Sequence, residues 1–173
     1  MRKSCLLIAA LCLSTPALAQ SLPEKTGMNS MMGIAPKTDD FINSAAVSDL
    51  FEIQSSQMAR ANPSLQTFAS RMITDHQKTT SELKQLLSSS NLATTPPSVV
   101  DDTHKRKLDT LNGLHGDSFV RQYREDQISA HQDALSLFRR YAKSGENAAL
   151  KKWAGDTIPT LEEHLKMAQS LPE

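Results

Sequence analysis

The stretch FASRMITDHQKTTSELKQL, residues 68–86, carries the pattern that decides the fold. On a helical wheel of 3.6 residues per turn, its apolar side chains gather on one face, together with those of Leu65 and Leu87. The middle of the same face holds His76, at a position where a leucine would be expected. The stretch therefore predicts an amphipathic helix that packs against other helices and buries one histidine.

The rest of the chain after residue 37 shows helix start and stop signals and no strand alternation. Pro63 suits the first position of a helix, and Gly145 suits the position after a last turn. Pro159 falls inside the last helix and is expected to kink it. The expected helices cover about residues 38–60, 62–88, 98–112, 117–143 and 146–171.

Four of these helices are long and one is short. The tight joins near Asn62 and Gly145 make antiparallel neighbours, whereas residues 89–97 form a Pro-rich linker that leads into the short helix. The linker and the short helix give a longer crossover between two helical hairpins. The expected fold is therefore all-α, a four-helix bundle with a short extra crossover helix.

The first residues have the features of a secretory signal peptide. A short basic start precedes an apolar run at residues 5–13, and Ala17-Leu18-Ala19 provides a small-x-small cleavage site. Lipidation is not expected, because Leu11 precedes Cys12 where a small residue is required. We expect residues 1–19 to be removed on export to the periplasm.

Three segments are then expected along the chain. They are the signal peptide at 1–19, a flexible N-terminal segment at 20–37, and the helical domain at 38–171. Both cysteines lie in the first segment, so no disulfide is expected after cleavage. No later apolar run approaches the ~20 residues of a membrane helix.

The charges argue against a nucleic-acid partner. The 19 basic and 19 acidic residues balance, and the basic ones are scattered instead of forming one face. The segment 20–37 contains Met28, Met31 and Met32. Clustered thioethers can bind copper(I), and chance methionines in a tail are the other interpretation.

Two more long helices carry a histidine on their apolar face, namely His131 and His164. The first long helix has a stripe of small side chains that leaves room for Glu52. Each long helix therefore sends one side chain inward that could bind a metal. His104 and His115 are expected at the surface.

Three imidazoles and one carboxylate suit a single iron(II), manganese, zinc or copper(II) ion. Asp75 and Asp126 lie beside the inward stripes and are candidates to orient an imidazole. Alternatively, the four groups could satisfy one another in a metal-free polar network that includes Tyr123 or a trapped water. The sequence leaves both interpretations open.

Three stretches resemble the bacterial domain-of-unknown-function 4142 family over about residues 39–171: FASRMITDHQKTTSELKQL, FVRQYREDQISAHQDALSLFRRYAKSGENAALKKWA and TIPTLEEHLKMAQSL. The markers are Asp75-His76, His131 and the run Pro159 to Leu165. The resemblance implies a ferritin-like bundle in the periplasm, in some cases peripheral to the outer membrane, and implies no activity. Phe119-Val120 departs from the family's usual Phe-Asp.

Ferritin-like di-iron proteins use Glu-x-x-His on two helices. The residues three positions before the inward histidines are Ile73, Ile128 and Leu161, so a single metal ion is expected instead of a di-iron centre. We expect a periplasmic metal-binding protein of unknown physiological role. The alternative is a metal-free helical module that binds an envelope partner, self-associates or acts in envelope stress.

The sequence assigns no catalytic residue. It contains no G-x-S-x-G motif and no Gly-rich phosphate loop. A binding protein is therefore expected in preference to an enzyme, and a redox role through bound metal is left open.

Overall fold

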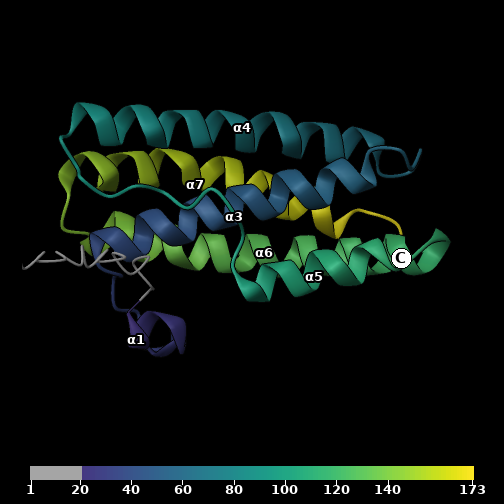
Figure 1. The fold of residues 1–173 in the computed structure, drawn as a ribbon, viewed down its shortest axis with the longest axis horizontal. Coiled ribbons are helices and arrows are strands. Elements are labelled where there is room, and N and C mark those ends of the chain that lie inside the picture. Colours follow the sequence, from purple (N-terminus) through teal and green to yellow (C-terminus); the bar gives the residue numbers. More distant parts are fainter. Residues whose placement is uncertain (1–20) are drawn as a thin grey trace, which may run out of the picture.

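The computed structural model describes residues 21–173, and they are helical with no strand (Figure 1). The expected all-α class is confirmed, while the expected signal peptide at 1–19 lies outside the described residues. The helices are α1 Leu22–Lys25, α2 Met28–Met31, α3 Thr38–Ala59, α4 Gln66–Ser89, α5 Asp102–Asn112, α6 Gly116–Ser144 and α7 Ala148–Gln169.

The four long helices lie side by side as two hairpins. α3 packs along α4, and α6 packs along α7, while α3 also contacts α6 and α4 contacts α7 (Figure 1). The chain crosses from α4 to α6 through a loop and the short helix α5, which rests on α3 and α6. Among residues 21–173, none of the helices combines the length and apolar character that crossing a bilayer demands.

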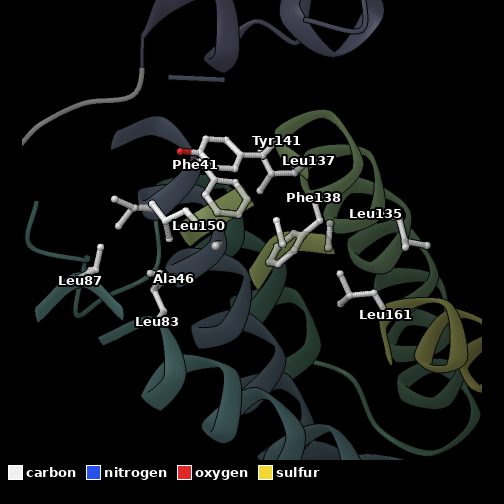
Figure 2. Packing of buried hydrophobic residues seen from close by; sticks show 14 residues of the cluster. Phe41, Ala46, Leu83, Leu87, Leu135, Leu137, Phe138, Tyr141, Leu150 and Leu161 are labelled. Atoms are coloured by element: carbon white, nitrogen blue, oxygen red, sulfur yellow. The ribbon is translucent and has the colours of Figure 1, made fainter. Parts of the chain in front are cut away.

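The apolar core contains two large clusters, to which all four long helices contribute, and a small third cluster of Phe51, Leu108 and Ala130. Figure 2 shows the first cluster, which lies where α3 begins and α4 ends. The first cluster comprises Phe41, Ile42, Ala45, Ala46, Leu83, Leu87, Ala134, Leu135, Leu137, Phe138, Tyr141, Leu150, Ala154 and Leu161. The second cluster comprises Ala59, Leu65, Phe68, Ala69, Met72, Leu111, Phe119, Val120, Tyr123 and Ala168.

Three helices begin later than the sequence indicates: α7 by two residues, at Ala148, and α4 and α5 by about four. Asn62 Oδ1 accepts hydrogen bonds from the backbone and hydroxyl of Ser64, at 2.9 and 2.8 Å, and this local turn takes the place of a helical cap. α4 therefore begins at Gln66. α5 begins at Asp102 because the Asp101 carboxylate accepts from the His104 N–H at 2.8 Å and caps the helix there.

The segment expected to be flexible carries α1, which is labelled in Figure 1, and α2, which contacts α6. Glu24 forms an ion pair with Arg140 of α6 at 2.7 Å. The Ser21 N–H and hydroxyl donate to the Asp40 carboxylate at 2.8 and 2.6 Å. These polar contacts with α3 and α6 explain how a segment without apolar periodicity is positioned.

Candidate metal centre

A polar layer separates the two apolar clusters. It consists of Asp49, Glu52 and Ser55 on α3, His76 on α4, Gln127 and His131 on α6, and His164 on α7, and all of these residues are buried. On α3, for example, the layer lies between Phe41 of the first cluster and Ala59 of the second. Glu52, His131 and His164 are each 1% exposed, and His76 is 3% exposed.

The three histidines meet in this layer although they come from three helices. The ring centroids are 5.8 Å apart for His76 and His131, 5.5 Å for His76 and His164, and 5.4 Å for His131 and His164. One ligand atom from each ring lies within 4.8 Å of those from the other two. The structure thus brings together the three histidines that the sequence places on inward faces.

His131 is oriented by its own helix. Its Nδ1 lies 2.8 Å from the backbone carbonyl oxygen of Gln127, one turn earlier. Because a carbonyl can only accept, Nδ1 carries the proton and Nε2 presents a lone pair. Nε2 is buried and has no hydrogen-bond partner within residues 21–173. Burial, reinforced by His76 and His164, lowers the pKa of His131 to about 3, which keeps the ring neutral.

His76 is oriented by a carboxylate on α3. Its Nδ1 donates to Asp49 Oδ1 at 2.8 Å, and the hydroxyls of Thr79 and Thr80 donate to the same carboxylate at 2.9 Å. The buried Nε2 finds no partner among the described residues. Burial opposes a charge on His76, but Asp49 and Glu52 outweigh it, so the pKa of His76 is raised.

His164 is oriented by a carboxylate on α4. Its Nε2 donates to Asp75 Oδ2 at 2.8 Å, and Arg71 Nε donates to the same oxygen at 2.5 Å. His164 Nδ1 is buried, and no group in the described part of the chain bonds to it. Burial lowers the pKa of His164, although the Asp75 carboxylate opposes that shift.

Glu52 extends its carboxylate into the layer beside His131, but among residues 21–173 the ligand atoms that lie within 4.8 Å of one another belong to the three histidines alone. Both carboxylate oxygens of Glu52 are buried and have no hydrogen-bond partner within residues 21–173. The imidazole nitrogen nearest to them is His131 Nδ1, which lies 3.9 Å from Oε1. That distance is too long for a hydrogen bond. Burial raises the pKa of Glu52 to about 7, against the opposing influence of His76 and the nearby Gln127 amide.

Two of the predicted orienting residues lie elsewhere. Asp126 Oδ1 is 3.6 Å from Lys107 Nζ of α5, and the Tyr123 hydroxyl is 2.8 Å from Ser56 Oγ. Asp126 is not the partner of His131 because the imidazole is already bonded to the Gln127 carbonyl. Asp75 does contact His164, as its position beside the inward face suggested.

Asp49 was missed by the sequence analysis. An aspartate is usually exposed, and α3 has buried polar residues on several sides, so its wheel gives no clear polar face. The available signal was spacing: Asp49 and Glu52 are three residues apart, which puts both carboxylates on one face of a helix.

The three buried histidines could hold a metal ion. In each ring one nitrogen donates to an acceptor, and the other is buried with no partner in the described part of the chain. Metal-bound histidines show the same arrangement, in which an outer hydrogen bond orients the ring. Nitrogens on one tetrahedral zinc, each about 2.1 Å from the ion, lie about 3.4 Å apart. Since the ligand atoms lie within 4.8 Å of one another, a modest inward movement of the rings gives that spacing.

Comparison with known proteins supports the resemblance found in the sequence. The family described as Domain of unknown function (DUF4142) matches residues 23–171. No curated protein and no solved structure matches the chain. Since the family match covers most of the chain, including α1 to α7 almost entirely, the protein belongs to the DUF4142 family.

Proposed function

We propose that this protein is an exported, ferritin-like four-helix bundle that binds one divalent transition-metal ion between its long helices. The ligands are His76 Nε2, His131 Nε2 and His164 Nδ1, and Glu52 is the fourth. The observation that carries the proposal is the set of three buried ring nitrogens that have no hydrogen-bond partner within residues 21–173. The other nitrogen of each ring is held by an acceptor.

The metal-free network explains these groups less well. Such a network needs Glu52 to accept from a histidine, and its nearest imidazole nitrogen is 3.9 Å away and already donates to a carbonyl. Each unsatisfied buried polar group costs about 1–3 kcal/mol. A metal ion would displace the proton that the raised pKa of His76 favours, would take one lone pair from each of the three rings, and would also offset the burial of the Glu52 charge.

The ligand set favours storage, buffering or sensing of a metal over catalysis. Neutral imidazoles with a carboxylate suit zinc, iron(II), manganese or copper(II). With Glu52 as the fourth ligand, a tetrahedral ion has no open position, which is typical of sites that hold a metal permanently or reversibly. The signal-peptide pattern at residues 1–19 supports a periplasmic location.

The test is metal analysis of the untagged protein after expression and export. We expect about one equivalent of metal per chain after dialysis against a defined mixture of zinc, iron(II), manganese and copper(II). A ligand that binds only the folded state stabilises it by about 2.7 kcal/mol when its free concentration is 100 times Kd. Thermal melts with each metal therefore identify the preferred ion.

His131→Ala and His164→Ala should lose both the bound metal and the rise in melting temperature. His115→Ala is the matched control, because His115 is exposed and its side chain forms no capping hydrogen bond at the start of α6. Circular dichroism shows whether the two core variants remain folded without metal. Wild-type protein that takes up no metal, and melts at the same temperature with every ion, would refute the proposal.

A further inference from the structure

The methionines near the N-terminus occupy a single helical turn. α2, Met28–Met31, lies between Gly27 and Gly33, whose φ angles of 74° and 65° belong to the left-handed region and stop the helix on both sides. Met28, Met31 and Met32 follow i, i+3, i+4 spacing. At 100° per residue they fall within about 100° of the circumference, so their side chains share one face.

This turn is fixed to the long helices by one arginine. Arg140 of α6 donates to both carboxylate oxygens of Glu24, at 2.7 and 3.3 Å, and to the backbone oxygen of Ile34 at 2.7 Å. The side chains of Arg140 and Glu24 are 10% and 8% exposed. The guanidinium therefore binds the chain on both sides of the methionine turn, at Glu24 before it and at Ile34 after it.

The orientation of the turn sends the thioethers to solvent. Ser30, on the opposite side of α2, lies 3.0 Å from Ser136 of α6, hydroxyl to hydroxyl. Met28, Met31 and Met32 are 56%, 90% and 67% exposed. Full burial of a methionine side chain supplies about 1.5–3 kcal/mol from removal of apolar surface from water. The observed orientation gives up that gain.

We propose that Met28, Met31 and Met32 form a binding site for a soft monovalent cation, copper(I), which silver(I) imitates. Thioethers are soft ligands that select copper(I) over the harder divalent ions. The Cβ atoms of residues three and four apart on a helix are about 5–6 Å from one another. The three rotatable bonds of methionine allow the sulfurs to converge on one ion from there.

This site does not depend on the histidine centre. Its ligands are thioethers on α2, whereas the histidines lie in the polar layer between α3, α4, α6 and α7. The two sites also differ in ligand hardness, so a chain that fails to bind zinc or iron could still bind copper(I). The proposal thus succeeds or fails separately from the proposed function.

The test uses protein labelled with ¹³C in the methionine methyl groups and titrated with silver(I), read by NMR. Mass spectrometry gives the N-terminus, and Cys5 and Cys12 are replaced by serine if the purified chain retains them. We expect the methyl signals of Met28, Met31 and Met32 to move together and to saturate at one equivalent. Those of Met58 and Met72 should stay in place.

The variant M28L/M31L/M32L should lose that equivalent of silver(I) and should melt at the wild-type temperature, since all three side chains are exposed. Met58→Leu is the matched control, because Met58 is also exposed, at 37%, but lies at the end of α3. Copper(I), kept reduced without oxygen, should compete with silver(I). The proposal is overturned if the three signals do not move, or if Met58 responds equally.

Discussion

The two large apolar clusters and the polar layer between them are built from the same four helices, yet they differ in how well their buried groups are satisfied. In the first cluster the contacts are complete: the Phe41 ring stacks on Tyr141 with centroids 3.9 Å apart and meets Phe138 edge-on at 5.2 Å. In the polar layer, His76 and His131 each leave a buried nitrogen without a partner in residues 21–173.

This difference indicates that the apolar clusters stabilise the fold, whereas the polar layer is the candidate for a function. Burial of apolar surface in the clusters supplies most of the driving force for folding. The polar layer opposes folding, because each unpaired buried group loses its hydration. A protein whose interior served only to hold the fold would gain from leucines in the layer. This cost of the layer is the reason why we propose that it binds a metal ion.

The largest effect is expected in the first cluster. Phe41→Ala removes a fully buried ring and should lower the free energy of unfolding by about 3–5 kcal/mol. Urea denaturation measures the change, and Val99→Ala, at a side chain that is 70% exposed, is the control. If both substitutions cost the same, Phe41 does not belong to the stabilising part of the core.

A somewhat smaller effect, of opposite sign, is expected in the polar layer. Because burial raises the pKa of Glu52 from 4.5 to about 7, the folded state binds a proton more tightly than the unfolded state. The wild-type protein, kept free of metal, therefore loses stability as the pH rises from 4.5 to about 7. Glu52→Gln removes this loss and should stabilise the metal-free protein above pH 7 by on the order of 3 kcal/mol.

Urea denaturation at pH 5 and pH 8 in the presence of a chelator tests this expectation. The gain from Glu52→Gln should be small at pH 5 and full at pH 8, and the variant should bind metal more weakly. Glu162→Gln, at an exposed carboxylate paired with Arg139, serves as the control. An equal gain at both pH values would show that the effect does not come from the Glu52 charge.

The third expected effect concerns the hydrogen bond that orients His164, one of the proposed metal ligands. Asp75→Asn keeps the shape of the side chain but removes the charge that orients His164, and should weaken metal binding about 10–100-fold. Isothermal titration with the preferred metal measures Kd. Asp156→Asn changes an exposed carboxylate of α7 that is paired with Lys152, and should leave Kd unchanged.

The smallest expected effect lies at the start of α7, beside the first cluster. Asn147 Oδ1 caps the helix by accepting from the Leu150 N–H at 3.0 Å. Asn147→Ala should lower the free energy of unfolding by about 1 kcal/mol without changing metal affinity. A change in the Kd for metal in this variant would show that the stability of the first cluster and metal binding in the polar layer are coupled.

The sequence was sufficient to predict the helices and the inward histidines, because both depend on local periodicity. Glycine, proline and capping residues bound the segments, and the wheel places His76, His131 and His164 among apolar side chains. The structure adds the distances between the rings, which depend on how far each helix is shifted along its neighbours. Periodicity within one helix carries no information on that shift.

The partners of the histidines were harder to predict for the same reason. Asp49 and His76 are 27 residues apart on different helices, so their contact follows from packing alone. His131 needs no carboxylate, because its partner is the backbone of its own helix, and this makes the predicted role of Asp126 unnecessary. Asp75 could be predicted as an orienting residue because it directly precedes His76 and therefore lies beside the inward face, although the histidine that it contacts is His164.

The position of the polar layer, midway between two apolar clusters, also has a consequence for the alignment of the helices. If α4 slid by one turn, about 5.4 Å, His76 would leave Asp49 and meet apolar side chains of a neighbouring helix. The His76 imidazole and the Asp49 carboxylate would then both be buried without the hydrogen bond that joins them. A layer made of leucines would tolerate such a shift more readily. We therefore expect the polar side chains that weaken the core also to fix the register of the four long helices.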